Sequence, residues 1–174
     1  MKKQEWNIKP VIDAWSYAIY EEDNRIFFVN YEISEFYIVN FVLTLLSGIL
    51  FVNGVVQLFF YPMAGIFILI LGIFSAILLH NSVEYIKRVK AKPLEEQKLT
   101  GIIDLDWANL LNEEGKETPL GEISIETMSQ LFSSSLMIVV KYPNGYYSIL
   151  MRGNPFSGWS WSFSYYLKKK WLMK

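Results

Sequence analysis

Hydrophobic and polar positions divide the chain into one long apolar stretch and two flanks in which apolar and polar residues alternate. Between Glu35 and Glu84 lie 48 consecutive residues without Asp, Glu, Lys or Arg. Tyr61-Pro62 divides this stretch into apolar runs at residues 36–60 and 63–79. About 20 helical residues cross a bilayer core of about 30 Å, and the residue before a proline disfavours helix. We therefore predict a transmembrane helical hairpin with almost no loop. The alternative is one long buried helix of a soluble protein. An apolar run of this length, without a polar face at helical spacing, does not favour it.

Small and polar residues inside the apolar stretch predict how the two helices pack. Small residues four or seven positions apart allow helix backbones to approach closely. The residues with this spacing are Thr44, Gly48, Gly65, Gly72 and Ala76. The first helix also contains the amides Asn40, Asn53 and Gln57, which could line a pathway or pair between helices. Because the stretch carries no charge, we favour packing or an interfacial position for them over a transport pathway.

Basic residues predict the orientation of the hairpin. Lys87, Arg88, Lys90 and Lys92 follow the second helix, whereas the turn at Tyr61-Pro62 is uncharged. An excess of Lys and Arg marks the cytoplasmic side of a membrane. We therefore expect an integral protein of the inner (cytoplasmic) membrane with both flanks, and so both termini, in the cytoplasm.

The N-terminal flank has the pattern of two β-strands. Val11–Tyr20 and Arg25–Ile33 are rich in aromatic and β-branched residues and are separated by a polar, turn-like cluster. A two-stranded hairpin is only marginally stable in water. We therefore expect these strands to join the strands of the C-terminal flank in one sheet, with the helical hairpin inserted between them.

The C-terminal flank continues with strands. Thr100–Trp107 alternates, with Ile103, Leu105 and Trp107 expected on one buried face, and Thr118–Ile123 begins another strand. The clearest hairpin is Leu136–Met151, because Asn144-Gly145 at its tip tolerates the positive φ angles of a tight turn.

The tail of the chain fits two patterns. Its aromatic residues keep helical spacing, with Asn154 and Pro155 as a helix start, but Trp159, Trp161 and Phe163 also alternate as in a strand. We favour a C-terminal helix. The predicted fold class is α+β: N-terminal strands in residues 1–35, a transmembrane α-helical hairpin in 36–80, a basic helical exit and linker in 81–98, and an antiparallel β-sheet domain with a C-terminal helix in 99–174.

Composition restricts the chemistry that the chain can perform. It has no cysteine and one histidine, which excludes a disulfide framework, a thiolate zinc site and a multi-histidine metal site. His80 fits an interfacial helix end better than a catalytic pair. Asp104 and Asp106 share one face of a strand, and we favour a solvated face over a metal site. We expect no catalytic residues, no cofactor, no metal and no small-molecule substrate, and therefore no enzyme.

Charge is distributed unevenly along the chain. Residues 1–126 hold 10 basic and 17 acidic side chains, whereas residues 127–174 hold 6 basic and no acidic ones. Each Lys or Arg near an anionic leaflet contributes about 1 kcal/mol of attraction, and tryptophan favours the interface. The residues predicted to contact the membrane surface are Lys87, Arg88, Lys90, Lys92, Lys168, Lys169, Lys170 and Trp171. The alternative is a solvated helix end whose lysines offset the helix dipole. Six basic groups on a membrane-tethered domain make nucleic acid binding a poor fit.

The order of these elements resembles that of small bacterial two-span membrane proteins with a pleckstrin-homology-like (PH-like) domain. The local likeness lies in Thr118–Ile123, which is similar to a strand of those domains, and in the hairpin Leu136–Met151 followed by the tail Pro155–Leu172. The resemblance implies a PH-like domain that acts as a non-enzymatic scaffold or sensor at the membrane surface.

The sequence therefore predicts a membrane-anchored binding module at the cytoplasmic face. Its expected partners are membrane lipids together with a protein partner or a second copy of the chain in an oligomer. Two alternatives stay open: an immunity or defence protein that protects its host against a bacteriocin or toxin, and an accessory subunit of a membrane complex.

Overall fold

The computed structural model describes residues 9–129, 136–152, 165–170 and 172. The chain forms two compact units, which are described separately. The sheet unit comprises Met1–Tyr31 and Pro93–Lys174, and the helical unit comprises Glu32–Lys92.

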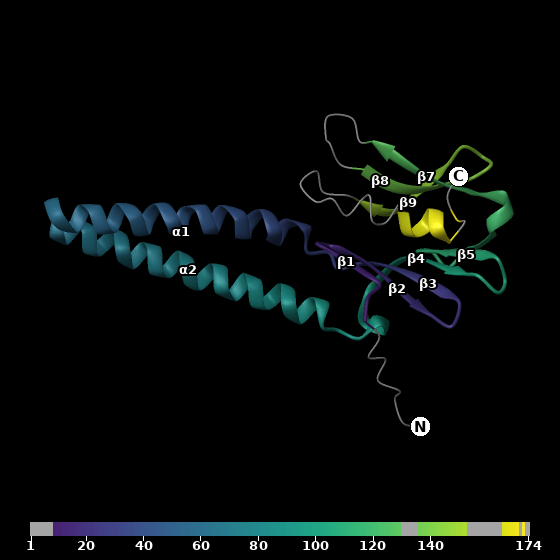
Figure 1. The fold of residues 1–174 in the computed structure, drawn as a ribbon, viewed down its shortest axis with the longest axis horizontal. Coiled ribbons are helices and arrows are strands. Elements are labelled where there is room, and N and C mark those ends of the chain that lie inside the picture. Colours follow the sequence, from purple (N-terminus) through teal and green to yellow (C-terminus); the bar gives the residue numbers. More distant parts are fainter. Residues whose placement is uncertain (1–8, 130–135, 153–164, 171, 173–174) are drawn as a thin grey trace, which may run out of the picture. The chain divides into compact units, whose positions relative to one another are not determined.

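The helical unit consists of two long antiparallel helices, α1 (Ser34–Phe60) and α2 (Pro62–Lys90) (Figure 1). A single residue, Tyr61, separates them, and its N–H donates to the Gln57 carbonyl at 2.7 Å. Pro62 occupies the first turn of α2, where its missing N–H costs no hydrogen bond. The predicted pair of helices with almost no loop is confirmed. The second helix ends at Lys90, inside the segment 81–98 predicted as a basic helical exit and linker.

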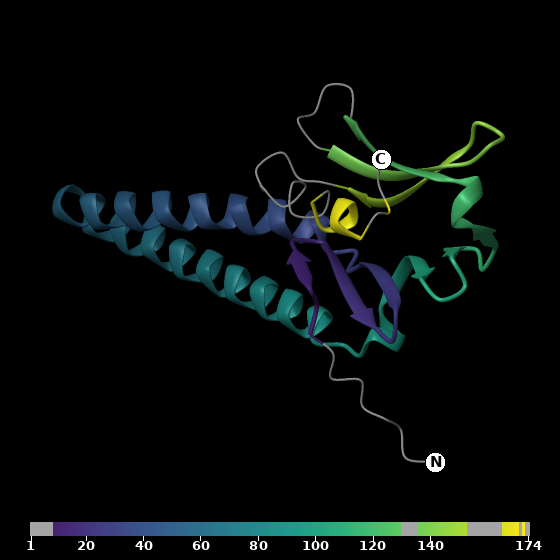
Figure 2. The ribbon, with the colours of Figure 1, turned by 45° about the vertical axis from the view of Figure 1, so that its right-hand side comes forward.

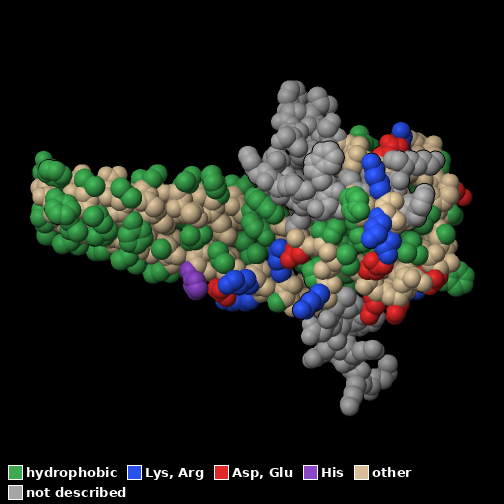
Figure 3. All heavy atoms as spheres, viewed as in Figure 1, with side chains coloured by type: hydrophobic (Ala, Val, Ile, Leu, Met, Phe, Trp, Pro, Cys, Tyr) green, Lys and Arg blue, Asp and Glu red, His purple; other side chains and the backbone are tan. Residues whose placement is uncertain are grey.

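Both helices are long and apolar enough to cross a membrane, and little of their apolar surface is buried. Figure 3 shows hydrophobic side chains over the helical pair, which is green and tan for most of its length. Phe41, Phe59 and Phe67, for example, are 65%, 81% and 62% exposed. A core helix of a soluble protein would bury such side chains.

The sheet unit contains a six-stranded antiparallel sheet in which neighbours in sequence are neighbours in space. Its strands are β1 (Ile12–Ala14), β2 (Tyr17–Glu22), β3 (Arg25–Asn30), β4 (Lys98–Asp104), β5 (Asn109–Asn112) and β6 (Glu117–Pro119). Strand β3 precedes the helices and β4 follows them, and the two pair from Arg25↔Asp104 to Asn30↔Lys98. The helical hairpin is thus an insertion between two paired strands.

The start of the sheet differs from the prediction of two strands. The expected strand Val11–Tyr20 is broken at Trp15, whose φ of 48° reverses the chain between β1 and β2. The turn between β2 and β3 also uses positive φ angles, 44° at Asp23 and 60° at Asn24, which suit a tight hairpin.

A second, three-stranded antiparallel sheet follows, made of β7 (Ser124–Ser129), β8 (Leu136–Lys141) and β9 (Tyr147–Arg152). The expectation of one sheet is therefore wrong for this part of the chain. The predicted strand 118–123 ends early, because after Pro119 the chain forms a 3-10 turn, Leu120–Glu122, and leaves the first sheet. The predicted hairpin between β8 and β9 is confirmed, with Gly145 at φ 81°.

Side chains from both sheets form one hydrophobic core; the sheets themselves can be followed in Figure 2. Strand β4 lies near β9, and the Thr100 hydroxyl donates to the Leu150 carbonyl at 2.6 Å. Residues 165–169 are helical, and Leu167 adds a fully buried side chain to the core. The expected C-terminal helix is thus present in these residues, while residues 153–164 lie outside the described part of the chain. The core side chains include Ile19, Phe28, Ile103, Leu110, Ile138, Val140, Leu150 and Met151.

Candidate functional site

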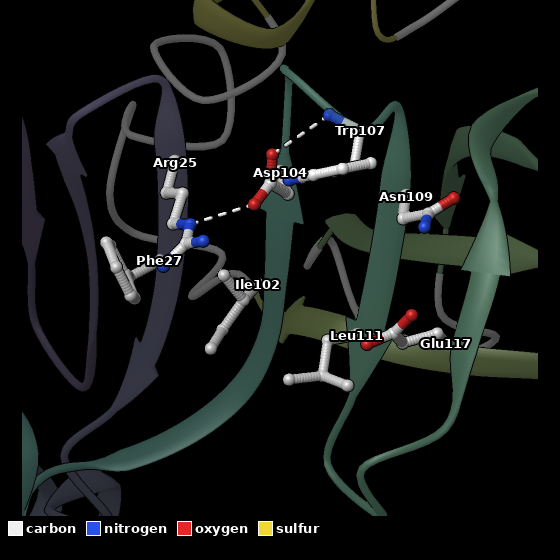
Figure 4. A pocket seen from close by; sticks show the side chains of 8 residues that line it. All are labelled: Arg25, Phe27, Ile102, Asp104, Trp107, Asn109, Leu111 and Glu117. Atoms are coloured by element: carbon white, nitrogen blue, oxygen red, sulfur yellow. Dashed lines mark hydrogen bonds and ion pairs between the residues drawn. The ribbon is translucent and has the colours of Figure 1, made fainter.

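The face of the six-stranded sheet opposite the core is hollowed into a pocket of about 410 Å³ (Figure 4). Side chains alternate between the two faces of a strand, so Ile26 and Phe28 of β3 enter the core while Arg25 and Phe27 face the pocket. The lining residues come from four adjacent strands and one turn: Arg25, Phe27, Ile102, Asp104, Trp107, Asn109, Leu111 and Glu117.

The pocket has a mixed surface. Phe27, Ile102 and Leu111 contribute apolar side chains, while Asp104 and Glu117 are acidic. A floor of apolar side chains with a few polar groups is typical of a binding site. Among the described residues, no group of three or more His, Asp and Glu side chains could hold a metal ion.

Asp104 connects the strand to the turn that follows it. Its carboxylate accepts the Arg25 Nε–H at 2.8 Å and the backbone N–H groups of Asp106 and Trp107, both at 3.1 Å. The bond from the Trp107 N–H, followed by the Arg25 guanidinium, holds the pKa of Asp104 below its usual range. Asp106 instead accepts a hydrogen bond from the Asn24 amide at 3.0 Å. Both carboxylates therefore stabilise turns.

Trp107 lies at this turn and is 76% exposed. The expectation that it would share a buried face with Ile103 is wrong, because β4 ends at Asp104 and Ala108 has a φ of 50°. The turn thus lifts a large aromatic ring out of the sheet beside the pocket. Such amphipathic rings are enriched where proteins bind one another.

The basic residues after the apolar stretch lie in the last turns of α2 and just beyond it. Lys87 forms an ion pair with Glu84 at 2.8 Å, and its side chain remains 67% exposed. Arg88 and Lys92 are exposed, and Lys90 is partly buried. These positions place four cations within six residues at one end of the helical unit.

The C-terminal lysines have different surroundings. Lys168 and Lys169 are exposed, whereas Lys170 forms an ion pair with Glu21 of β2, which also accepts the Tyr166 hydroxyl at 2.6 Å. The hydrogen bonds from Lys170 and then Tyr166 lower the pKa of Glu21, and burial raises the pKa of Tyr166. Lys170 therefore attaches the C-terminal segment to the sheet, which the prediction of membrane contact did not include. Trp171 lies outside the described residues.

A row of positions spaced by three and four residues forms the contact between α1 and α2. In α1 these positions are Asn40, Leu43, Ser47, Leu50, Gly54 and Gln57, all buried or partly buried. This heptad spacing is that of packed helix pairs. Near its centre, the Ser47 hydroxyl donates to the Ser75 hydroxyl at 2.9 Å.

The predicted packing residues divide between this contact and the exposed surface. A Cβ added to Gly65 would lie 2.5 Å from the Leu58 nitrogen, so here the backbones touch. Gly72 is also buried against α1, and Ala76 is partly buried. Thr44 and Gly48 are exposed, and a Cβ added to Gly48 would meet nothing within 4 Å, so neither takes part in the α1–α2 contact.

Sequence reasoning did not identify the pocket. The available signal was the alternation of Arg25 and Phe27 in β3 with Ile102 and Asp104 in β4, which places polar and apolar side chains on the outer face. That face becomes visible only when the register of β3 against β4 is known. Comparison with protein-family models, curated proteins and solved structures finds no match for the chain. The likeness to PH-like proteins therefore stays a prediction.

Proposed function

We propose that the protein is a non-enzymatic binding module that is anchored in the inner membrane by its helical hairpin and recruits a protein partner at the cytoplasmic surface. The observation that carries this proposal is the insertion of two apolar, outwardly exposed helices between the paired strands β3 and β4. Because the chain enters and leaves the hairpin from adjacent strands, the sheet unit is tethered to the bilayer twice.

The basic residues support the cytoplasmic orientation. The cations from Lys87 to Lys92 follow α2, and the turn at Tyr61 carries no charge. Lys168 and Lys169 are exposed cations that can add attraction to an anionic leaflet. In this proposal, lipid contact positions the module at the membrane, and its function is to recruit the protein partner.

The outer face of the six-stranded sheet supports the recruitment of a protein. Residues 9–31 and 93–119, which form this sheet and its turns, contain 11 acidic and 4 basic side chains. The pocket has an apolar floor and an exposed tryptophan beside it. These features fit a partner segment that combines apolar residues with lysine or arginine, because opposite charges steer association and apolar burial holds it.

The anchor and its orientation can be tested with single cysteines, because the chain contains none. Asp23→Cys lies in an exposed turn of the sheet unit and Tyr61→Cys in the turn between the helices. The test uses cells whose inner membrane is intact and from which any outer barrier has been removed. A membrane-impermeant maleimide added to these cells should label Tyr61→Cys. It should label Asp23→Cys only after the inner membrane is permeabilised. Recovery of the chain in the soluble fraction without detergent, or labelling of both sites from outside, would contradict the proposal.

The recruiting face can be tested with two matched aromatic residues. Trp107 beside the pocket and Tyr146 in the β8–β9 turn are both 76% exposed. In pull-downs of the detergent-solubilised chain analysed by mass spectrometry, Trp107→Ala should lose the partner that the unchanged protein retains, and Tyr146→Ala should keep it. Equal loss or equal retention in both variants would show that the outer face is not the recruiting surface.

A further inference from the structure

Helix α1 carries a second heptad row, on a side that α2 does not cover. Its members are spaced four, three, four, three and four residues apart, and all are exposed: Val42, Leu46, Ile49, Asn53, Val56 and Phe60. We call these residues the outer seam. Every member is a large apolar residue except Asn53.

Asn53 lies too deep to reach water if the hairpin spans a bilayer. It is five residues, roughly 8 Å along the helix, from the middle of the apolar run 36–60. Its side chain makes no hydrogen bond to any residue that the structure describes. Gln57 is only three residues from the end of α1 and has a longer side chain, so it can reach the headgroups.

An amide surrounded by lipid tails has no partner for its N–H and C=O groups, and such polar groups in membrane helices are satisfied by other helices. An asparagine amide offers both donors and an acceptor, so it is complementary to itself. Two copies of the chain inserted in the same orientation place Asn53 at the same depth. A single asparagine within an apolar heptad row is also known to fix the register of parallel helix pairs.

We infer that the protein forms a parallel dimer in the membrane through the outer seams of two α1 helices, with the two Asn53 amides hydrogen-bonded to each other. This inference rests on the proposed membrane anchoring and extends it by naming a second copy of the chain as the partner within the bilayer.

The test uses the full chain reconstituted in vesicles of phosphatidylcholine and phosphatidylglycerol. Val56→Cys is on the outer seam, and Ile73→Cys on α2 is the matched control, since these side chains are 47% and 51% exposed. Oxidation should give disulfide-linked dimers for Val56→Cys and not for Ile73→Cys. Equal cross-linking at both positions, or none at Val56→Cys, would overturn the inference.

The role of the amide is tested in the Val56→Cys background. Asn53→Leu should weaken association about tenfold, seen as a loss of cross-linked dimer at a fixed ratio of protein to lipid. Asn53→Gln keeps an amide at this depth and should retain most of the dimer, and Gln57→Leu should leave it unchanged. Unaltered cross-linking in Asn53→Leu, or cross-links to a different membrane protein in cells, would overturn the inference.

The two proposals fail in different ways. Chains that embed in the vesicles but remain monomeric overturn the dimer and leave the anchor intact. Chains that do not enter the vesicles overturn both.

Discussion

The helical unit and the sheet unit bury opposite kinds of residue. In the two helices, the buried positions are small or polar residues with one exception, while most phenylalanine, isoleucine and leucine side chains lie on the outside; the buried residues are Ser47, Gly54, Gly65, Gly72, Ser75 and the exception, Ile86. The sheet unit places its large apolar side chains inside and its charges on the surface.

This contrast is what the proposed membrane anchoring of the helical unit predicts, because water and lipid favour the burial of different residues. In water, burying apolar area is the main favourable contribution to folding. Between helices in lipid, that contribution disappears, because lipid tails are as apolar as leucine, and close backbone packing and hydrogen bonds replace it. In the helical unit, the Ser47–Ser75 hydrogen bond and the close backbone contact at Gly65 are interactions of these two kinds.

The largest effect should come from the core of the sheet unit. Phe28→Ala removes a fully buried ring and should lower the free energy of unfolding by about 3–5 kcal/mol. The control is the next residue, since Phe27 faces the pocket and is partly exposed; Phe27→Ala should cost about 1–2 kcal/mol. Urea denaturation of the full chain in detergent, followed by tryptophan fluorescence, measures both. Equal losses would show that the two faces of β3 are not distinguished by burial.

A smaller effect is expected from the helix contact. Gly65→Leu forces a side chain against the backbone of Leu58 and Gly54, which should destabilise the helical pair by about 1–3 kcal/mol. Gly48→Leu, at an exposed position with open space around it, should have little effect. The midpoint of unfolding in a titration with sodium dodecyl sulfate reports the difference. A Gly48→Leu variant as unstable as Gly65→Leu would contradict the α1–α2 contact described above.

The smallest effect should come from the ion pair between Glu21 and Lys170. Its hydrogen bonds lower the pKa of Glu21 from an ordinary value of 4.5. The stabilisation is therefore fully present above pH 4.5 and is lost as the pH falls through the lowered pKa of the folded state. Because both side chains are about 30% exposed, its size should be about 1 kcal/mol.

Glu21→Gln is the variant that isolates this ion pair. It should be less stable than the unchanged protein at pH 7 by about that amount, and the difference should shrink below pH 4.5. Urea midpoints measured from pH 3 to pH 7 give the comparison. A difference that stays constant over this range would show that the charge of Glu21 does not attach the C-terminal segment.

Local patterns predicted the elements better than their assembly. The absence of charge from residue 36 to 83 and the proline at position 62 were enough to place both helices. Asn144-Gly145 was enough to place the β8–β9 hairpin. The sequence patterns did not predict the division into two sheets. This division depends on a 3-10 turn at Leu120–Glu122, which alternation of apolar and polar residues cannot predict.

The candidate site was less predictable than the fold. Trp107 looked like a buried strand residue because it continues the alternation of Ile103 and Leu105. It is exposed because the Asp104 carboxylate binds the backbone N–H groups of the following turn and ends the strand first. Lys170 looked like a membrane contact because it belongs to a run of lysines, and its partner Glu21 is 149 residues away.

The sequence by itself determined that the chain has an apolar helical hairpin between two strand-forming, charged flanks, because length, charge and proline act through neighbouring residues. Only the tertiary structure decided which face of each element is covered. It placed Gly65 in the helix contact and Gly48 outside it, and it placed Phe28 in the core and Phe27 in the pocket. Those outcomes depend on the register between segments far apart in the chain, and a one-residue change in register would reverse the two faces of a strand.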